Sequence, residues 1–138
     1  MADWRKELGN ILEKRAQASR AELENARFET FLNDVVSPAL NELAAELRAH
    51  GRIADVRATP AAMRLSVNNG EYEEILFRVL RRSVPNTVIA YAEIRLRKGQ
   101  RLVHMDAPIK DGPSAPLETT TKDDIIACFL KHYGMIFS

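Results

Sequence analysis

The sequence has a single cysteine, Cys128, which excludes an intramolecular disulfide framework. This cysteine lies in an apolar, helix-like run, where a free cysteine is typically a small buried hydrophobic residue. The N-terminus lacks the apolar stretch of a signal peptide, and no uncharged run approaches the roughly 20 apolar residues that cross a bilayer. These absences predict a soluble, cytoplasmic protein without a membrane segment.

A net charge of either sign is also missing, because 20 Lys and Arg residues oppose 19 Asp and Glu residues, for a formal charge of +1. This balance disfavours both a globally basic nucleic-acid-binding protein and a strongly acidic chaperone. Aromatic residues make up only 7% of the chain, but hydrophobic residues make up 46%, which is enough for an ordinary folded core. The length fits a single domain over residues 1–138.

Signatures of catalysis, cofactors and metals are absent as well. The six glycines are isolated, so there is no glycine-rich loop to cradle a phosphate. His50, His104 and His132 lie far apart, without metal-ligand spacing. His104 precedes Asp106 by two residues, and a His–Asp pair can orient a general base, but no nucleophile is identifiable. We therefore expect a non-enzymatic protein with no catalytic residue, no cofactor and no metal.

The first third of the chain is rich in Ala, Leu, Glu and Arg, which favour helix. Over residues 28–50, apolar residues recur every three or four positions, as in a helix that buries one stripe against a core. Pro38 interrupts this stripe and predicts a kink, or a break followed by a new helix. Gly51 provides the expected left-handed cap at the end of this core helix.

Residues 1–27 have a different pattern from the core helix. Trp4, Leu8, Ile11 and Leu12 form an apolar patch and Leu23 begins another, whereas residues 13–22 contain no large apolar side chain. Such a helix has little to bury against its own domain. Two interpretations remain open. Either the segment projects as a helical arm whose patch contacts another subunit or a partner, or it folds back onto the domain or is only partly ordered.

After the core helix, the period changes from helical to alternating. Residues 53–106 predict an antiparallel meander of four or five strands joined by short turns, and the Asn69-Gly70 pair marks one hairpin. Residues 107–120 contain three prolines and predict a loop, and residues 121–134 predict a C-terminal helix. The predicted fold is a two-layer α+β sandwich.

Charge is unevenly distributed along the chain. Residues 52–110 hold 11 basic and 6 acidic residues, so the predicted sheet is locally basic. Strand alternation places five of its side chains on the outer face, opposite the apolar positions: Arg64, Arg78, Tyr91, Arg95 and Arg97. A face with arginines and an aromatic ring suits single-stranded nucleic acid or another polyanion. The opposing interpretation is a solvated face whose arginines pair with Glu73, Glu74 or Glu93.

The order of a helix, a small antiparallel sheet and a second helix resembles the small secretion chaperones. Those proteins are usually acidic and have a helix inserted within the sheet, which this pattern does not place. The resemblance implies the binding of a partner protein. Our main hypothesis is a non-enzymatic interaction domain that acts as a homodimer, or with a protein partner, through Trp4, Leu8 and Leu12. Nucleic-acid binding on the sheet and chaperone-like partner binding are the alternatives.

Overall fold

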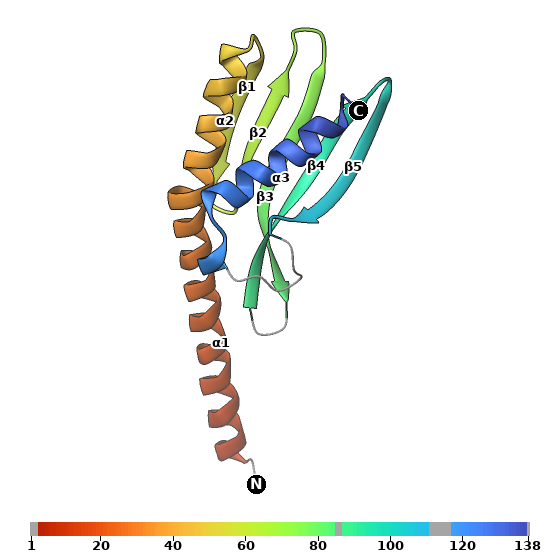
Figure 1. The fold of residues 1–138 in the computed structure, drawn as a ribbon. Coiled ribbons are helices and arrows are strands. Elements are labelled where there is room, and N and C mark those ends of the chain that lie inside the picture. The colour runs from red at the N-terminus through yellow and green to blue at the C-terminus, as the bar shows by residue number, and fades with distance from the viewer. Residues whose placement is uncertain (1–2, 85–86, 111–116, 138) are drawn as a thin grey trace.

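A computed structural model describes residues 3–84, 87–110 and 117–137 of the chain. It consists of a long N-terminal helix, a five-stranded antiparallel sheet and a C-terminal helix. The helices α2 and α3 lie on one face of the sheet, and α1 extends beyond the end of the sheet (Figure 1). The two-layer α+β architecture predicted from the sequence is therefore confirmed.

The N-terminal helix continues through Pro38 without a break. α1 (Trp4–Phe31) leads into one π-helical turn, η1 (Leu32–Val36), and then into α2 (Ser37–Ala49). In the π turn the Ser37 N–H donates to the Leu32 carbonyl, five residues back. A proline ring crowds the turn before it, and a widened turn relieves that contact. The predicted irregularity thus takes the form of a π turn directly before the proline.

The end of α2 has the predicted glycine cap. Gly51 has φ of +84°, a left-handed conformation that glycine adopts without a Cβ penalty. The Arg52 N–H donates to the Leu47 carbonyl at 2.9 Å, and the Gly51 N–H donates to the Arg48 carbonyl at 3.0 Å. These are the two hydrogen bonds of a Schellman motif. The motif turns the chain sharply from α2 into the first strand.

The sheet is a meander in which every strand pairs with the next one along the chain, in the order β1-β2-β3-β4-β5. The strands are β1 (Ile53–Thr59), β2 (Ala62–Asn68), β3 (Glu73–Val84), β4 (Thr87–Lys98) and β5 (Arg101–Pro108). Over the described part of the chain, no helix separates consecutive strands.

The hairpin predicted at Asn69-Gly70 joins β2 to β3. Gly70 has φ of +100°, and its N–H donates to the Asn68 side chain at 2.7 Å. The Asn69 side-chain oxygen accepts from the Glu71 N–H at 2.9 Å. Asparagine side chains that bond the backbone two residues later are a common way to close a turn.

The C-terminal part of the sheet differs from its predicted bounds. β5 continues two residues past 106, so Ala107 and Pro108 belong to the sheet and not to the predicted loop. The predicted loop over 107–120 also includes a short 3-10 turn, η2 (Leu117–Thr119), while its residues 111–116 lie outside the described part.

α3 (Lys122–Met135) follows with a reciprocal capping box. The Asp124 N–H donates to the Thr121 hydroxyl oxygen at 3.3 Å, and the Thr121 N–H donates to the Asp124 carboxylate at 2.8 Å. The two bonds satisfy backbone donors that have no partner within the helix. The helix therefore begins where the sequence predicts and ends one residue later than predicted.

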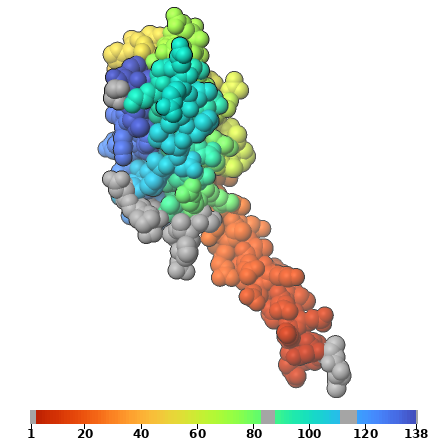
Figure 2. Space-filling model, turned by 90° about the vertical axis from the view of Figure 1, so that its right-hand side faces the viewer, coloured from red at the N-terminus to blue at the C-terminus, as the bar shows by residue number. Residues whose placement is uncertain are grey.

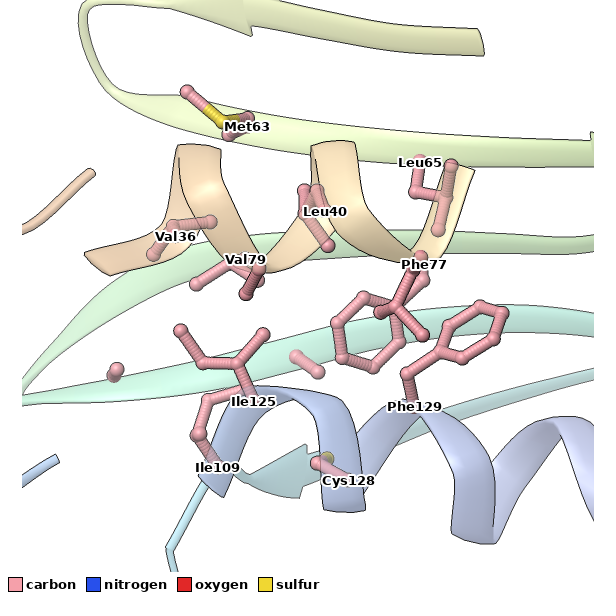
Figure 3. Packing of buried hydrophobic residues seen from close by; sticks show 14 of the residues in the cluster. Val36, Leu40, Met63, Leu65, Phe77, Val79, Ile109, Ile125, Cys128 and Phe129 are labelled. Carbon is pink, nitrogen blue, oxygen red and sulfur yellow. The ribbon is translucent and has the colours of Figure 1, made fainter. Parts of the chain in front are cut away.

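The core lies between the sheet and the two helices that cover it. Leu40 of α2, Leu65 of β2 and Phe77 of β3 are fully buried, and they meet side chains of α3 (Figure 3). The rings of Phe77 and Phe129 pack edge to face, with centroids 5.5 Å apart. The inner face of the sheet is built from the apolar positions that the alternation predicts on β1 to β4, except near the end of β1, where Ala58 is exposed.

Candidate interaction surfaces

The first 24 residues of α1 form an arm that projects from the body of the protein (Figures 1 and 2). Every residue from 3 to 27 is exposed. The three predicted contact residues lie on this arm, with exposed fractions of 59% for Trp4, 47% for Leu8 and 57% for Leu12. The interpretation in which the segment folds back onto the domain is therefore wrong for this structure.

The exposed apolar residues of the arm share one side of the helix. At about 100° per residue, Trp4, Leu8, Leu12 and Leu23 fall within about a third of the circumference. Leu23 and Ile11 are as exposed as the predicted contact residues. The sequence pattern places both in apolar patches, but neither is among the three predicted contact residues. The spacing contains the signal for Leu23, because it follows Leu12 by eleven residues, or about three helical turns. We call Trp4, Leu8, Leu12 and Leu23 the arm stripe, and Ile11 lies beside it at about 20° from Trp4.

The arm stripe runs into a surface hollow at the base of the arm. The hollow has a volume of about 440 Å³ and lies between α1 and η2. It is lined mainly by apolar atoms, and its walls include Leu23, Ala26 and Thr30 of α1 together with Leu117 of η2. Asp34 and Glu118 also line it. Sequence reasoning missed the hollow because its two walls are distant in the chain.

The five residues predicted for an anionic ligand do share the outer face of the sheet. Arg64 of β2 lies opposite Arg78 of β3, and Arg95 and Arg97 lie on the same face of β4 as Tyr91. The alternating burial along β4 confirms the assignment, because its intervening residues are buried in the core.

Acidic side chains neutralise much of this basic face. Arg78 pairs with Glu93 at 3.2 Å, and Arg95 pairs with Glu73 at 2.6 Å. Arg82 pairs with Asp106 at 3.7 Å across β4. Arg64 makes no ion pair with any described residue. Most of the positive charge is thus balanced by side chains of the same face.

The aromatic rings of the outer face are already covered by cations. The Arg82 guanidinium lies 4.3 Å from the centroid of Tyr91, and the Arg97 guanidinium lies 5.1 Å from that of Tyr72. A guanidinium over a ring is a favourable cation–π arrangement. A nucleic-acid base could stack on either ring only after displacing this arginine, so the arrangement weakens the case for a stacking platform.

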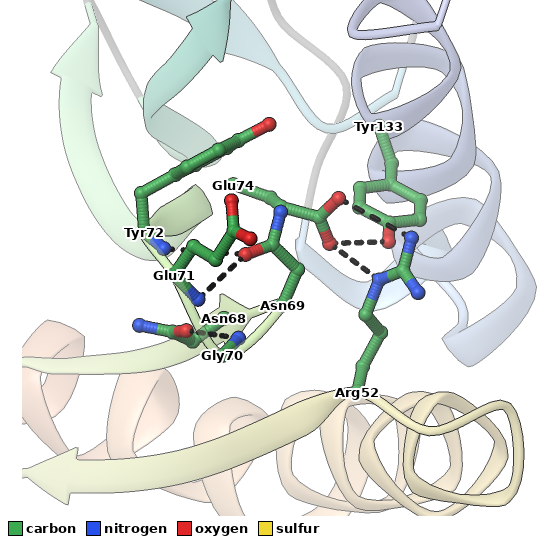
Figure 4. Close-up of polar contacts among 8 residues, drawn as sticks. All are labelled: Arg52, Asn68, Asn69, Gly70, Glu71, Tyr72, Glu74 and Tyr133. Carbon is green, nitrogen blue, oxygen red and sulfur yellow. Dashed lines mark hydrogen bonds and ion pairs between the residues drawn. The ribbon is translucent and has the colours of Figure 1, made fainter.

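The predicted pairing of Glu74 with an arginine of the outer face requires its side chain to lie on that face. Its side chain lies on the inner face of the sheet instead. The register between β2 and β3 shifts at Val67 and Asn68, and Glu74 is skipped in the pairing. Its side chain is only 2% exposed and points toward α3. The Arg52 Nε donates to the Glu74 carboxylate at 2.8 Å, and the Tyr133 hydroxyl donates to the same oxygen at 2.8 Å (Figure 4).

This three-residue cluster ties the loop after α2 to β3 and α3. Burial raises the pKa of the Tyr133 hydroxyl above its ordinary value, and its hydrogen bond to the Glu74 carboxylate adds to that effect. The hydrogen bond to Glu74 also raises the pKa of Arg52. The Glu74 carboxylate is held between the Arg52 guanidinium and the Tyr133 hydroxyl, which is the geometry of a structural contact.

His104 and Asp106 line a surface hollow of about 340 Å³, together with Arg78, Glu93 and Arg95. No group of three or more metal-binding side chains occurs in residues 3–84, 87–110 and 117–137. His104 lies opposite Arg95 in the sheet, while Asp106 pairs with Arg82. Cys128 is buried, as predicted.

Comparisons of the chain with protein-family models, curated proteins and solved structures found no match in any of the three. No helix in the described ranges is long and apolar enough to span a membrane. The assignment of a function therefore depends on the surfaces of this chain alone.

Proposed function

We propose that the chain is a non-enzymatic protein-interaction domain that self-associates as a homodimer through its projecting arm. The observation that carries the proposal is the arm stripe. Trp4 and three leucines gather on one side of the exposed part of α1. Large apolar side chains that share an exposed patch typically mark an interaction site.

The energetics of the arm support this role. All of its residues from 3 to 27 are exposed, so they gain little from packing against the domain and depend mainly on helix propensity. Packing a second surface on the stripe would remove Trp4 and the leucines from water, at about 25 cal/mol for each Å² of apolar area. In this view the sheet and α3 form the scaffold that presents the arm.

The solution mass of the intact chain, measured by light scattering, tests the proposal. We expect a dimer for the intact chain and a monomer for the double variant Trp4→Ala, Leu8→Ala. Leu130→Ala is the matched control, because Leu130 is a similarly exposed leucine on α3, at 55%. This control should keep the dimer mass.

A chain lacking residues 1–22 should also be a monomer, and its circular dichroism should still show the folded core. An intact chain that is monomeric at all concentrations would contradict the proposal. So would an unchanged dimer mass in the double variant.

A further inference from the structure

We infer that the arm stripe is covered by the arm of a second copy of this chain, packed antiparallel and centred between Ala16 and Ser19. The inference rests on the proposed function, and it adds the partner, the direction and the register. A two-fold dimer uses the same patch on both subunits, so the patch must be complementary to itself. Three features of the arm have this self-complementarity.

The first feature is the spacing of the residues along the contact side. Leu12, Ala16, Ser19 and Leu23 follow one another at intervals of four, three and four residues, a pattern that reads the same in both directions. In an antiparallel pair, Leu12 of one copy meets Leu23 of the other, and Ala16 meets Ser19. Small residues at the crossing let the helix axes approach closely, while the leucines fill both sides.

The second feature is the charge on the two flanks of this contact side. Glu13 and Arg20 lie on one flank, and Arg15 and Glu22 lie on the other. Antiparallel helices bring like flanks together, so each Glu13 lies beside the Arg20 of the other copy, and each Arg15 beside its Glu22. A parallel pair would instead place Arg15 beside Arg20. Flank charges of this kind set the direction of helix pairs.

These four charged side chains are free to pair in this way. None of them makes an ion pair with another residue that the structure describes. Their pairing in the dimer therefore breaks no salt bridge of the single chain.

The third feature is the charge of the two halves of the helix. Residues 3–20 contain five basic and three acidic side chains, whereas residues 21–34 contain one basic and four acidic side chains. Antiparallel packing places the basic half of each copy over the acidic half of the other. Arg5 and Lys6 then approach the hollow, whose lining includes Asp34 and Glu118.

The same register assigns an occupant to the hollow at the base of the arm. When Leu12 meets Leu23, Leu8 lies at the level of Arg27 in the second copy, and Trp4 lies at the level of Phe31. Both Arg27 and Phe31 line the hollow. The first turns of one arm thus cover the hollow of the other copy, twice in each dimer.

Disulfide cross-linking tests the direction and the register. Two full-length variants, Leu12→Cys and Leu23→Cys, each also carry Cys128→Ala so that only the introduced thiol remains. After mixing and subunit exchange, mild oxidation should join position 12 of one chain to position 23 of the other, and neither variant should cross-link with itself. Self-linked chains of each variant would indicate a parallel pair and would overturn the inference, as would the absence of any cross-link.

Charge reversal with rescue provides a second, independent readout. Glu13→Arg places two arginines together at two symmetric positions and should weaken the dimer about tenfold by sedimentation equilibrium. The double variant Glu13→Arg, Arg20→Glu restores both pairs and should return the dissociation constant to that of the unmodified chain. Glu7→Arg is the matched control, because Glu7 lies on the far side of the helix, and it should leave the constant unchanged.

The outcomes separate this inference from the proposed function. A dimer that is lost in Trp4→Ala, Leu8→Ala but cross-links in another pattern would leave the proposed function standing and overturn the antiparallel register. An equal loss in Glu13→Arg and in its double variant would also overturn the register. A monomeric intact chain would overturn both.

Discussion

The arm and α2 belong to one uninterrupted helical segment, yet they have opposite surroundings. Both are rich in the same helix-forming residues, and both have an apolar stripe. In α2 the stripe is buried, with Ala39, Leu40 and Ala44 at 0% exposure, because the sheet and α3 pack against it. In the arm the stripe meets only solvent. Helix propensity therefore determines the shape of both regions, and packing determines which stripe stabilises the fold.

This difference assigns different tasks to the two regions. Burying a leucine such as Leu40 of α2 contributes about 1.5–3 kcal/mol to the free energy of unfolding. The same residue type in the arm contributes nothing to the fold of the single chain, and becomes useful only when a second surface covers it. Substitutions should thus divide into those that unfold the core and those that only dissociate the proposed dimer.

The largest expected effect is on core packing. Phe77→Ala removes a fully buried ring that contacts Phe129, and it should lower the free energy of unfolding by about 3–5 kcal/mol. Leu12→Ala should change it by less than about 0.5 kcal/mol when measured at concentrations where the chain is monomeric. Urea unfolding of both variants checks this, and equal losses would erase the distinction between the core and the arm.

Two adjacent glutamates sharpen the comparison between a buried and an exposed charge. Glu74→Ala leaves the Tyr133 hydroxyl and Arg52 without their carboxylate and should cost about 1–3 kcal/mol. Glu73→Ala removes a partly exposed pair with Arg95 and should cost less than about 1 kcal/mol. Thermal or urea unfolding measures which variant loses more stability. A greater loss of unfolding free energy in Glu73→Ala than in Glu74→Ala would contradict the assignment of Glu74 to the inner face.

The pH dependence of stability offers a subtler test of the same cluster. The pKa of Tyr133 is raised in the folded chain, so its proton stays bound at a pH where the unfolded chain loses it, near about 10. The resulting stability is fully present below that pH and is lost as the pH rises through the folded-state pKa. In Tyr133→Phe, the decline above pH ~10 should be shallower. Urea unfolding between neutral and alkaline pH measures both slopes, and identical slopes would exclude Tyr133 as their source.

The smallest expected effect concerns the outer face of the sheet. Because acidic partners balance its arginines, a labelled single-stranded oligonucleotide should bind weakly at low salt and lose binding as the salt concentration rises. Arg64→Ala should reduce whatever binding exists more than Arg78→Ala, since Arg78 is already paired with Glu93. The absence of binding at low salt would exclude the nucleic-acid alternative. Tight binding at moderate salt would instead indicate that the outer face of the sheet binds nucleic acid.

Much of the fold follows from local patterns that the sequence contains. The three-and-four spacing over 28–50, the alternation over 53–106 and the glycine at 51 identify a core helix, a meander and a helix cap. Each of these depends on neighbours within a few positions, where the geometry of helix and strand is nearly invariant. The outer-face residues and the contact residues of the arm could be named for the same reason.

The tertiary structure decided the features that depend on residues far apart in the chain, such as the face on which Glu74 lies and the hollow at the base of the arm. One shifted register between β2 and β3 turns Glu74 inward, because a bulge changes the face of a side chain without changing the residues around it. The hollow exists because η2 returns beside α1 from the other end of the chain. The sequence by itself determined the elements and their apolar faces, since these depend on local periodicity. Which charges are balanced and which stripe stays uncovered depended on long-range packing, which no local pattern encodes.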